Sequence, residues 1–482
     1  MTSNPPVGGV VGSLARRVRD GEARATDVIA EHLEAIRERN VALNAVVEVF
    51  PDEAMAAAEQ IDRRRAAGEP LGPLAGVPVS IKMNIDVAGH ATTHGVPAFK
   101  DAIAPADAPV VARLRAADAV IIARGNMPDM SMRLHTASQL FGATRNLFDE
   151  RLSPGGSSGG DAVAVASGMA ALGLGNDAGG SVRVPASFAG ICGLKPTTGR
   201  MASDRAIGRD VTFASQVIPV DGFLARSVDD LGLAFSVAAG PDVRDPRAVP
   251  VTTSYRRDQR RRVGLTVDPG ALGVDAETEA GLLQSAEALR DAGYATELID
   301  APELASALEA YDGLIMTEFA QAWPMFERLL GPDVQRYIKY AMAIGPPLNL
   351  GGYLAATSER MRLQRLWLEM IEPFDAVLGP VYCAPIPEID ADIESIESHA
   401  DCARALRLCR ASSLVGFPAV SVSVRSSTGL PVGVQLLAAP FDEANALLAA
   451  GEIERRIGFG PDHERHLFHS SDRAWTTERL HP

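Results

Sequence analysis

The stretch SPGGSSGGDAVAVASGMAALGLGNDAGGSVR, residues 153–183, places a helix-like segment and a short apolar strand between two glycine clusters. We expect a helix at 160–169 and a buried strand at 170–175, because a short apolar run bounded by turn residues is typical of a strand covered on both faces. Residues 151–200 hold 12 of the 44 glycines, a density that lets the backbone approach a ligand closely. The stretch therefore predicts both a piece of the fold and a candidate site.

Outward from this stretch, the chain alternates strand-like and helix-like segments. GVPVSIK (76–82) and AVIIAR (119–124) are expected to be further buried strands, with a helix at 108–117 between them. Towards the C-terminus, PAVSVSV (418–424) and PVGVQLLA (431–438) flank the turn residues SSTG, which predicts a β-hairpin. This order of elements predicts an α/β fold, and the hairpin makes a mixed sheet the expected core.

The N-terminal segment, residues 1–70, is expected to be helical. An Ala-rich helix is predicted at 52–67. Thr26 is the expected N-cap of an earlier helix whose apolar residues fall on one face: Val28, Ile29, Leu33 and Ile36. No Ser-, Pro- or Gly-rich or like-charged run divides the chain, so residues 1–482 are expected to form one large domain with insertions.

Composition and charge favour a soluble globular protein that does not bind nucleic acid. The net charge of −15 opposes polyphosphate binding, and the basic run RRDQRRR (256–262) is expected to be a solvated loop. Four cysteines in 482 residues make no disulfide framework, and none has metal-ligand spacing, which points to a reducing compartment. The N-terminus has no signal-like apolar region, and the charge-free run 162–176 is too short and too rich in Ala and Gly for a membrane span. The expected location is cytoplasmic.

Three interpretations of the glycine clusters are disfavoured by their context. A flexible linker is disfavoured because ordered-looking elements lie on both sides. A phosphate cradle needs G-x-x-x-x-G-K-[ST], which is absent, and GLGNDA (173–178) lacks the second strand ending in an acid that a dinucleotide site requires. GGSSG (155–159) matches a nucleophile elbow centred on Ser157, but the preceding NLFDERLSP is polar and ends in proline. Ser157 is therefore expected in a loop.

A set of motifs makes the chain resemble the amidase signature family. They are GVPVSIKMNIDVAG (76–89), FGATRN (141–146), SPGGSSGG (153–160), GNDAGGSVRVPASFAGICGLKPTTGR (175–200) and GLPVGVQLL (429–437). The resemblance runs from about residue 25 to 457. It implies a single large α/β domain with a mixed β-sheet core covered by helices on both faces, and amide hydrolysis with no cofactor and no metal.

The resemblance implies a Ser–cis-Ser–Lys triad formed by Lys82, Ser157 and Ser181. A lysine amine takes a proton only when neutral, so the pKa of Lys82 must fall by about three units from its usual value near 10.4. The similarity then implies that Lys82 takes a proton through Ser157 while Ser181 attacks the amide carbon and forms an acyl-enzyme. The expected oxyanion hole consists of the backbone N–H groups of Ala178, Gly179, Gly180 and Ser181.

Other polar residues near these motifs have less specific patterns. Asp177 and Arg183 are expected to form an ion pair that braces the oxyanion loop, the alternative being two unrelated surface charges. His90, His94 and His135 raise the alternative of a Ser-His-Asp triad, but no partner pattern supports it, and ordinary loop or core histidines are the expectation.

Two positions depart from relatives of the family. The residue after Lys82 is usually Asp, whereas this chain has Met83, which cannot accept a hydrogen bond as a carboxylate does. Val184 stands where the glutamine-using relatives carry Gln. The loss of that polar group disfavours a substrate with a charged carboxylate and ammonium.

By similarity, residues 300–370 are expected to be a variable helical insertion beside the substrate pocket. The candidate substrate-binding residues are Met130, Phe319 and Trp323, with ordinary core packing as the alternative. The expected reaction is hydrolysis of a small apolar or aryl carboxamide or anilide, with secondary esterase activity. The expected partner is this small-molecule amide, with a homodimer left open. The alternatives are the A-type subunit of a glutamine-dependent aminoacyl-tRNA amidotransferase and a non-catalytic binding protein with the same fold.

Overall fold

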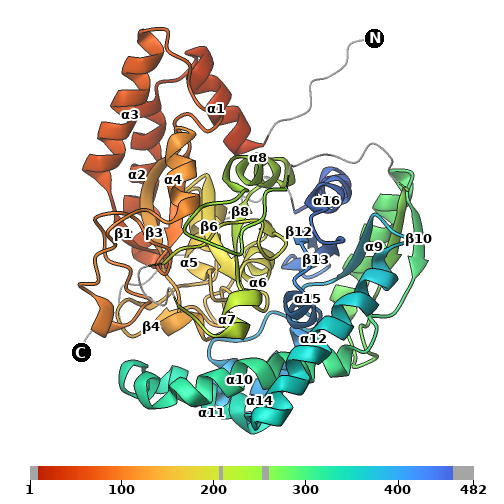
Figure 1. Cartoon of the computed structure of the whole chain (residues 1–482). Coiled ribbons are helices and arrows are strands. Elements are labelled where there is room, and N and C mark those ends of the chain that lie inside the picture. The colour runs from red at the N-terminus through yellow and green to blue at the C-terminus, as the bar shows by residue number, and fades with distance from the viewer. Residues whose placement is uncertain (1–8, 206–209, 252–259, 460–482) are drawn as a thin grey trace.

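The strands predicted around the glycine clusters lie side by side in one sheet of the computed structural model, which describes residues 9–205, 210–251 and 260–459. The first four residues of the basic run, 256–259, lie outside the described residues. Within the described residues the sheet has 11 strands in the order β1-β3-β2-β6-β8-β7-β12-β13-β11-β9-β10 (Figure 1). The strands are β1 (Val46–Val49), β2 (Pro78–Lys82), β3 (Val120–Gly125), β6 (Leu172–Asp177), β7 (Cys192–Lys195), β8 (Val220–Ala225), β9 (Arg262–Leu265), β10 (Ala295–Leu298), β11 (Ala376–Pro380), β12 (Ala419–Arg425) and β13 (Pro431–Leu437).

The prediction of a mixed sheet is confirmed. Strands β3, β2 and β6 are parallel neighbours, as are β11, β9 and β10, and the remaining neighbouring pairs of the sheet are antiparallel. The predicted hairpin is the antiparallel pair β12 and β13. The predicted strand 170–175 begins and ends two residues later, as β6, so the sequence GLGND lies inside a strand and does not form a phosphate-binding turn.

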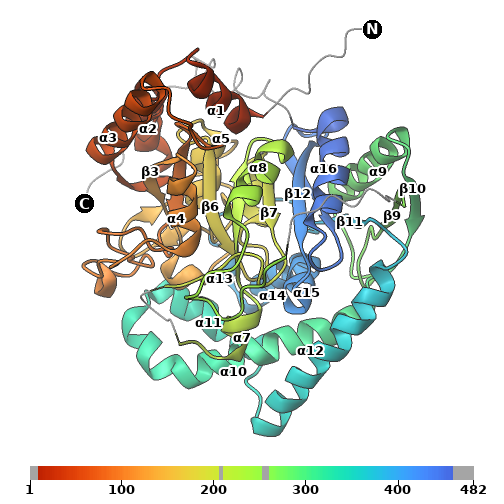
Figure 2. The ribbon, with the colours of Figure 1, turned by 45° about the horizontal axis from the view of Figure 1, so that its top comes forward.

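Helices cover both faces of the sheet, as expected. Successive strand residues point to opposite faces, so neighbouring positions of β13 identify what covers each side. Val432 packs on Gly281 of α9 (Ala276–Asp291), whereas Gly433 packs on Ser187 of α6 (Arg183–Phe188). The two helices therefore lie on opposite faces. Figure 2 shows the same sheet from a second angle, with helices in front of it and behind it.

The N-terminal segment is helical and also supplies an edge strand. Helices α1 (Val10–Asp20), α2 (Ala25–Leu43) and α3 (Pro51–Ala66) stand together at the β1 end of the sheet (Figure 1). The prediction of Thr26 as an N-cap is wrong, because α2 begins at Ala25. The Thr26 hydroxyl instead donates a 2.8 Å hydrogen bond to Asp62 of α3, a partner that a local capping pattern does not reveal.

Three helices occupy most of residues 300–370, and the role of this segment as an insertion beside the substrate pocket stays a prediction. Helices α10 (Leu304–Leu329), α11 (Pro332–Ile344) and α12 (Leu350–Ile371) run along the lower edge of the molecule in Figure 2. In the described part of the chain, no helix is both long and apolar enough to cross a membrane. The remaining helices are α4 (Pro109–Ala116), α5 (Gly159–Ala166), α7 (Phe213–Val217), α8 (Val228–Ala238), α13 (Ala391–Glu394), α14 (Ile396–Ala405), α15 (Arg407–Val415) and α16 (Glu443–Ile457).

Candidate active site

Lys82 is the last residue of β2, and its ammonium group is completely buried. Its Nζ lies 2.6 Å from Ser157 Oγ and donates a 2.8 Å hydrogen bond to Asn176 Oδ1 on the neighbouring strand β6. Burial lowers the pKa of Lys82 to about 7, because a charged amine loses its hydration in the protein interior. At mildly alkaline pH this side chain is therefore a neutral amine in contact with a serine hydroxyl.

A chain of side-chain amides continues from Lys82 towards the loop that follows β3. Asn176 Nδ2 donates to Asn84 Oδ1 at 2.9 Å, and Asn84 Nδ2 donates to Ser131 Oγ at 3.1 Å. The sequence analysis missed Asn84, Asn176 and Ser131, although Asn84 lies only two residues after the lysine. Met83 is buried, and its backbone N–H bonds Gly125 O at 3.2 Å. The polar support of Lys82 therefore comes from strand β6, not from position 83.

Ser157 lies in the loop before α5, as predicted, in a setting that leaves no room for larger neighbours. A Cβ at Gly156 would lie 2.5 Å from Arg133 O, and Gly155 has a φ of +79°. These positions therefore require glycine. The Gly156–Ser157 peptide bond is cis.

The second glycine cluster lies directly against the first. The N–H of Ser158 donates a 3.1 Å hydrogen bond to the carbonyl oxygen of Ser181. Ser157 and Lys82 are completely buried, whereas Ser181 is half-buried. The structure thus brings the three predicted residues into one region and leaves Ser181 as the one open towards solvent. Their catalytic roles remain predictions.

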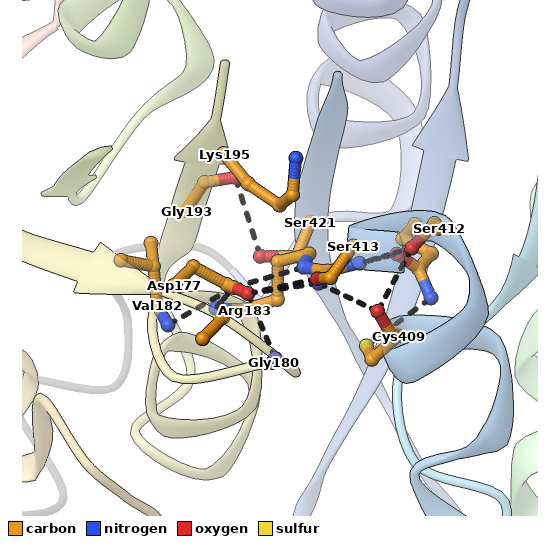
Figure 3. Close-up of polar contacts among 12 residues, drawn as sticks. Asp177, Gly180, Val182, Arg183, Gly193, Lys195, Cys409, Ser412, Ser413 and Ser421 are labelled. Carbon is orange, nitrogen blue, oxygen red and sulfur yellow. Dashed lines mark hydrogen bonds and ion pairs between the residues drawn. The ribbon is translucent and has the colours of Figure 1, made fainter. Parts of the chain in front are cut away.

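The predicted ion pair between Asp177 and Arg183 is confirmed. Arg183 Nη2 lies 2.9 Å from Asp177 Oδ1, and Arg183 Nε donates to Oδ2 at 3.0 Å, with both side chains completely buried. The remaining guanidinium N–H groups donate to Cys409 O, Ser412 Oγ and Ser413 Oγ of α15 (Figure 3). One of them also donates to Gln435 Oε1 of β13. Burial alone would raise the pKa of Asp177, but the Arg183 charge and several N–H donors hold it well below its usual value.

The same carboxylate also binds the turn that contains the predicted oxyanion donors. Asp177 Oδ1 accepts a 2.8 Å hydrogen bond from the N–H of Gly180, and Oδ2 accepts one of 3.1 Å from Val182. The Gly180 N–H therefore helps to close the turn. The roles of Ala178, Gly179, Gly180 and Ser181 as oxyanion donors stay predictions. A carboxylate that ties successive backbone N–H groups together holds the shape of this turn.

We expect Arg183→Met to destabilise the protein by about 3–5 kcal/mol, because it leaves the Asp177 carboxylate buried without its cation. Urea denaturation of the variant and the wild type measures this change. The matched control is Arg151→Met, which removes the exposed partner of Asp149 and should change stability little. Equal effects of the two substitutions would contradict a bracing role for Arg183.

The three histidines are not arranged as a triad with the serines. His90 contacts the carboxylates of Glu48 and Glu53. His94 and His135 are buried, and burial lowers their pKa values to about 3 and about 4. Both are therefore neutral near pH 7. Among the side-chain hydrogen bonds of the described residues, none joins these three histidines to Ser157 or Ser181, and Lys82 holds the contact that a catalytic base needs.

Two of the three candidate substrate-binding residues share one apolar cluster. Met130 and Trp323 pack around a centre formed by Val96, Leu330, Val334 and Ile338, in company with Met132, Phe326 and Tyr337. Phe319 contacts Phe326, a member of this cluster, with the two ring centroids 5.5 Å apart. Met130, Phe319 and Trp323 are all half-buried. Their contact with a substrate remains a prediction.

Two contacts link the segments that carry this apolar cluster to the serine and lysine region. Ser131, next to Met130, is the last residue of the hydrogen-bonded series that runs from Lys82 through Asn176 and Asn84. The hydroxyl of Tyr311, on the same helix α10 as Trp323, donates to Ala178 O at 3.2 Å, in the turn before Ser181. Val184 is buried against Phe188 and Cys409 in a separate apolar cluster. Its side chain has no polar atom.

Two surface cavities lie apart from the predicted catalytic, oxyanion and substrate-binding residues. One of about 340 Å³ is lined by residues that include Tyr382, Pro385 and Glu388. The other, of about 240 Å³, is lined by residues that include Phe50 and His90. None of the predicted site residues lines either cavity.

Comparison with known proteins gives matches across most of the chain. A sequence model of the Amidase family matches residues 27–447. Indoleacetamide hydrolase of Bradyrhizobium diazoefficiens is 34% identical over 448 residues, covering 92% of this chain and 86% of the relative. The A-type subunit of glutamyl-tRNA(Gln) amidotransferase from Synechococcus sp. is 34% identical over 480 residues, covering 92% and 96%. The structure of 6-aminohexanoate cyclic dimer hydrolase complexed with substrate has 27% identity and a TM-score of 0.79, covering 93% and 96%.

Proposed function

The chain belongs to the amidase signature family, whose enzymes hydrolyse amides, and from this premise we propose that it cleaves the C–N bond of a small apolar or aryl carboxamide or anilide through an acyl-enzyme on Ser181. One observation carries the proposal. A buried lysine amine lies 2.6 Å from Ser157 Oγ, in the loop whose next residue is hydrogen-bonded to Ser181.

The proposed proton path follows from the contacts of Lys82. The side-chain oxygen Oδ1 of Asn176 can only accept hydrogen bonds, so it binds one N–H of the neutral Lys82 amine. The lone pair of the amine nitrogen is then left for the Ser157 proton. As Ser157 gives its proton to Lys82, it takes the proton of Ser181, whose oxygen attacks the amide carbon. The proposed donors to the oxyanion are the N–H groups of Ala178, Gly179, Gly180 and Ser181.

The second half of the proposed reaction reverses the proton path. Ser157 protonates the leaving amine and regains a proton from Lys82, so the C–N bond breaks without expelling an amide anion. Water then attacks the acyl-enzyme, and its proton returns through Ser157 as Ser181 is released. The path needs Lys82 neutral in the free enzyme.

The apolar cluster supports the proposed substrate class. Met130, Phe319 and Trp323 offer polarizable and aromatic surface, which favours a ring over a charged group. Val184 offers no partner for an ammonium or carboxylate, and an unpaired polar group in a closed site costs about 1–3 kcal/mol. A relative named for indoleacetamide, itself an aryl acetamide, is in keeping with this class.

A second candidate function is that of the A-type component of a tRNA-dependent amidotransferase, favoured by the extent of the match to that protein. The net charge of −15 and the apolar Val184 weigh against it, because that activity uses glutamine and an RNA partner.

We expect the purified chain alone to hydrolyse phenylacetamide, benzamide or an acetanilide with a higher kcat/KM than glutamine or asparagine. Release of ammonia or amine over this panel, extended to a long-chain fatty amide and an aryl ester, measures the preference. Ser181→Ala protein purified in the same way controls for contaminating amidases. If the kcat/KM for glutamine or asparagine exceeds that for every apolar amide, the pocket assignment is wrong and the amidotransferase becomes the favoured function. A protein that hydrolyses nothing and resists labelling by a fluorophosphonate is a non-catalytic binding protein.

A further inference from the structure

The buried carboxylate of Asp161 lies on the same face of the sheet as the side chain of Lys82. Asp161 on α5 is completely buried, and its Oδ1 accepts a 2.6 Å hydrogen bond from Ser80 Oγ. Ser80 and Lys82 are two residues apart on β2, so their side chains point to the same face of the sheet. Asp161 and Lys82 therefore occupy the same layer between β2 and α5.

The sheet is shaped to receive this carboxylate. Strand β2 has β3 on one side and β6 on the other, and each neighbour has a glycine where Asp161 approaches. A Cβ at Gly125 of β3 would lie 2.3 Å from Asp161 Oδ1, and a Cβ at Gly173 of β6 would lie 3.2 Å from Asp161 Cβ. The position opposite Gly173 on β2 is Ser80, which supplies the hydrogen bond. Three adjacent strands thus form a recess that an aspartate fits.

The charge of Asp161 has few protein partners in this recess. Its Oδ2 has no hydrogen-bond partner among the described residues. A buried carboxylate keeps its charge only where cations face it. The charged groups that act on Asp161 are Lys82 and Arg124, and those that act on Lys82 besides Asp161 are Arg205, Asp177 and Asp221.

The pKa values of Asp161 and Lys82 are both shifted mainly by burial. Burial raises the pKa of Asp161 to about 7, against the hydrogen bond of Ser80 and the charge of Lys82. Burial lowers the pKa of Lys82, and Asp161 is the charge that opposes this most. Without Asp161 the amine would bind a proton still more weakly. A weaker base takes the Ser157 proton less readily.

We propose that Asp161 is a positioning residue that sets the basicity of Lys82, its carboxylate being held under the strand by Ser80 and by the space that Gly125 and Gly173 leave. This inference rests on the proposed amidase function and adds a residue to it. Asp161 touches no reacting atom in this proposal, because it acts through the electric field at Lys82.

The chain offers a direct measurement, because it has only four lysines: Lys82, Lys100, Lys195 and Lys339. Protein labelled with ¹³C at lysine Cε gives four signals, and Lys82→Met assigns the signal of interest. In Asp161→Asn we expect the titration midpoint of Lys82 to fall by about one unit or more, since an opposite charge has been removed. The acid limb of kcat/KM should move to lower pH by the same amount, with a lower plateau.

The matched control is Asp230→Asn. Asp230 is likewise buried with an Oδ2 that lacks a hydrogen-bond partner, but it lies on α8, where it accepts from the N–H of Gly12. Its replacement should leave the Lys82 midpoint unchanged. Asp161→Ser, which is smaller and also neutral, replaces Asp161→Asn if the amide prevents folding. The wild type supplies a further test, because two coupled groups should give Lys82 a two-step titration curve.

The outcomes separate this inference from the proposed function. An unchanged Lys82 midpoint in the neutral variants, or a single-step wild-type curve with unit slope, overturns the role of Asp161 even if amides are hydrolysed. A lowered midpoint in a protein that hydrolyses no amide upholds the coupling of Asp161 to Lys82 and overturns the amidase proposal.

Discussion

Ser181→Ala is expected to lower kcat for an apolar amide by about 10⁴-fold or more while the protein stays folded. The substitution removes the oxygen that forms the acyl-enzyme but leaves the backbone N–H groups of the turn in place. Steady-state hydrolysis and thermal unfolding, measured on the same preparation, separate a catalytic loss from a folding loss.

A matched control for this substitution is Ser167→Ala. Among the described residues, the Ser167 hydroxyl bonds only the carbonyl groups of Val163 and Ala164 of α5, and it should be dispensable for turnover. Labelling by a fluorophosphonate should disappear in Ser181→Ala and persist in Ser167→Ala. Turnover of Ser181→Ala close to that of the wild type would reject Ser181 as the nucleophile.

Lys82→Met and Ser157→Ala are each expected to lower kcat by about 10³-fold or more, and the double variant little further. The reason is that the amine and the hydroxyl, 2.6 Å apart, form one proton path, and breaking either end removes all of it. The double-mutant cycle on kcat is the measurement. Losses that multiply would show that the two groups act independently.

The control here is Lys195→Met. Lys195 is also buried, and burial lowers its pKa to about 7, but its Nζ donates to Phe417 O at 2.8 Å and to Pro196 O at 3.1 Å. We expect this variant to lose stability and to keep kcat within about tenfold of the wild type. If it loses as much activity as Lys82→Met, contact with Ser157 is not what distinguishes Lys82.

Much of the fold was predictable from local patterns. The apolar runs at 76–82 and 119–124 became β2 and β3, and the hairpin around SSTG became β12 and β13, because hydrophobic runs and turn residues act over a few neighbouring positions. The motifs also identified Lys82, Ser157 and Ser181 as the candidate triad, and the ion pair of Asp177 with Arg183 was found as expected.

The local patterns failed where a polar group found a distant partner. Thr26 fits an N-cap by its residue type, yet its hydroxyl bonds Asp62, 36 residues away. The Asp62 carboxylate on α3 is a strong acceptor that only the folded structure brings to this position.

The sequence by itself predicted five of the eleven strands of the sheet (β2, β3, β6, β12 and β13), the glycine-rich loops and the candidate residues for the chemistry. Only the tertiary structure decided what surrounds Lys82. Asn176 is 94 residues away in the chain and meets the lysine because β6 pairs with β2. Ser157 is 75 residues away and reaches the lysine from the loop before α5. The recess for Asp161 likewise exists only once Gly125, Ser80 and Gly173 lie on adjacent strands. The environment that lowers the pKa of this lysine is a property of strand order and burial, which no local stretch of sequence encodes.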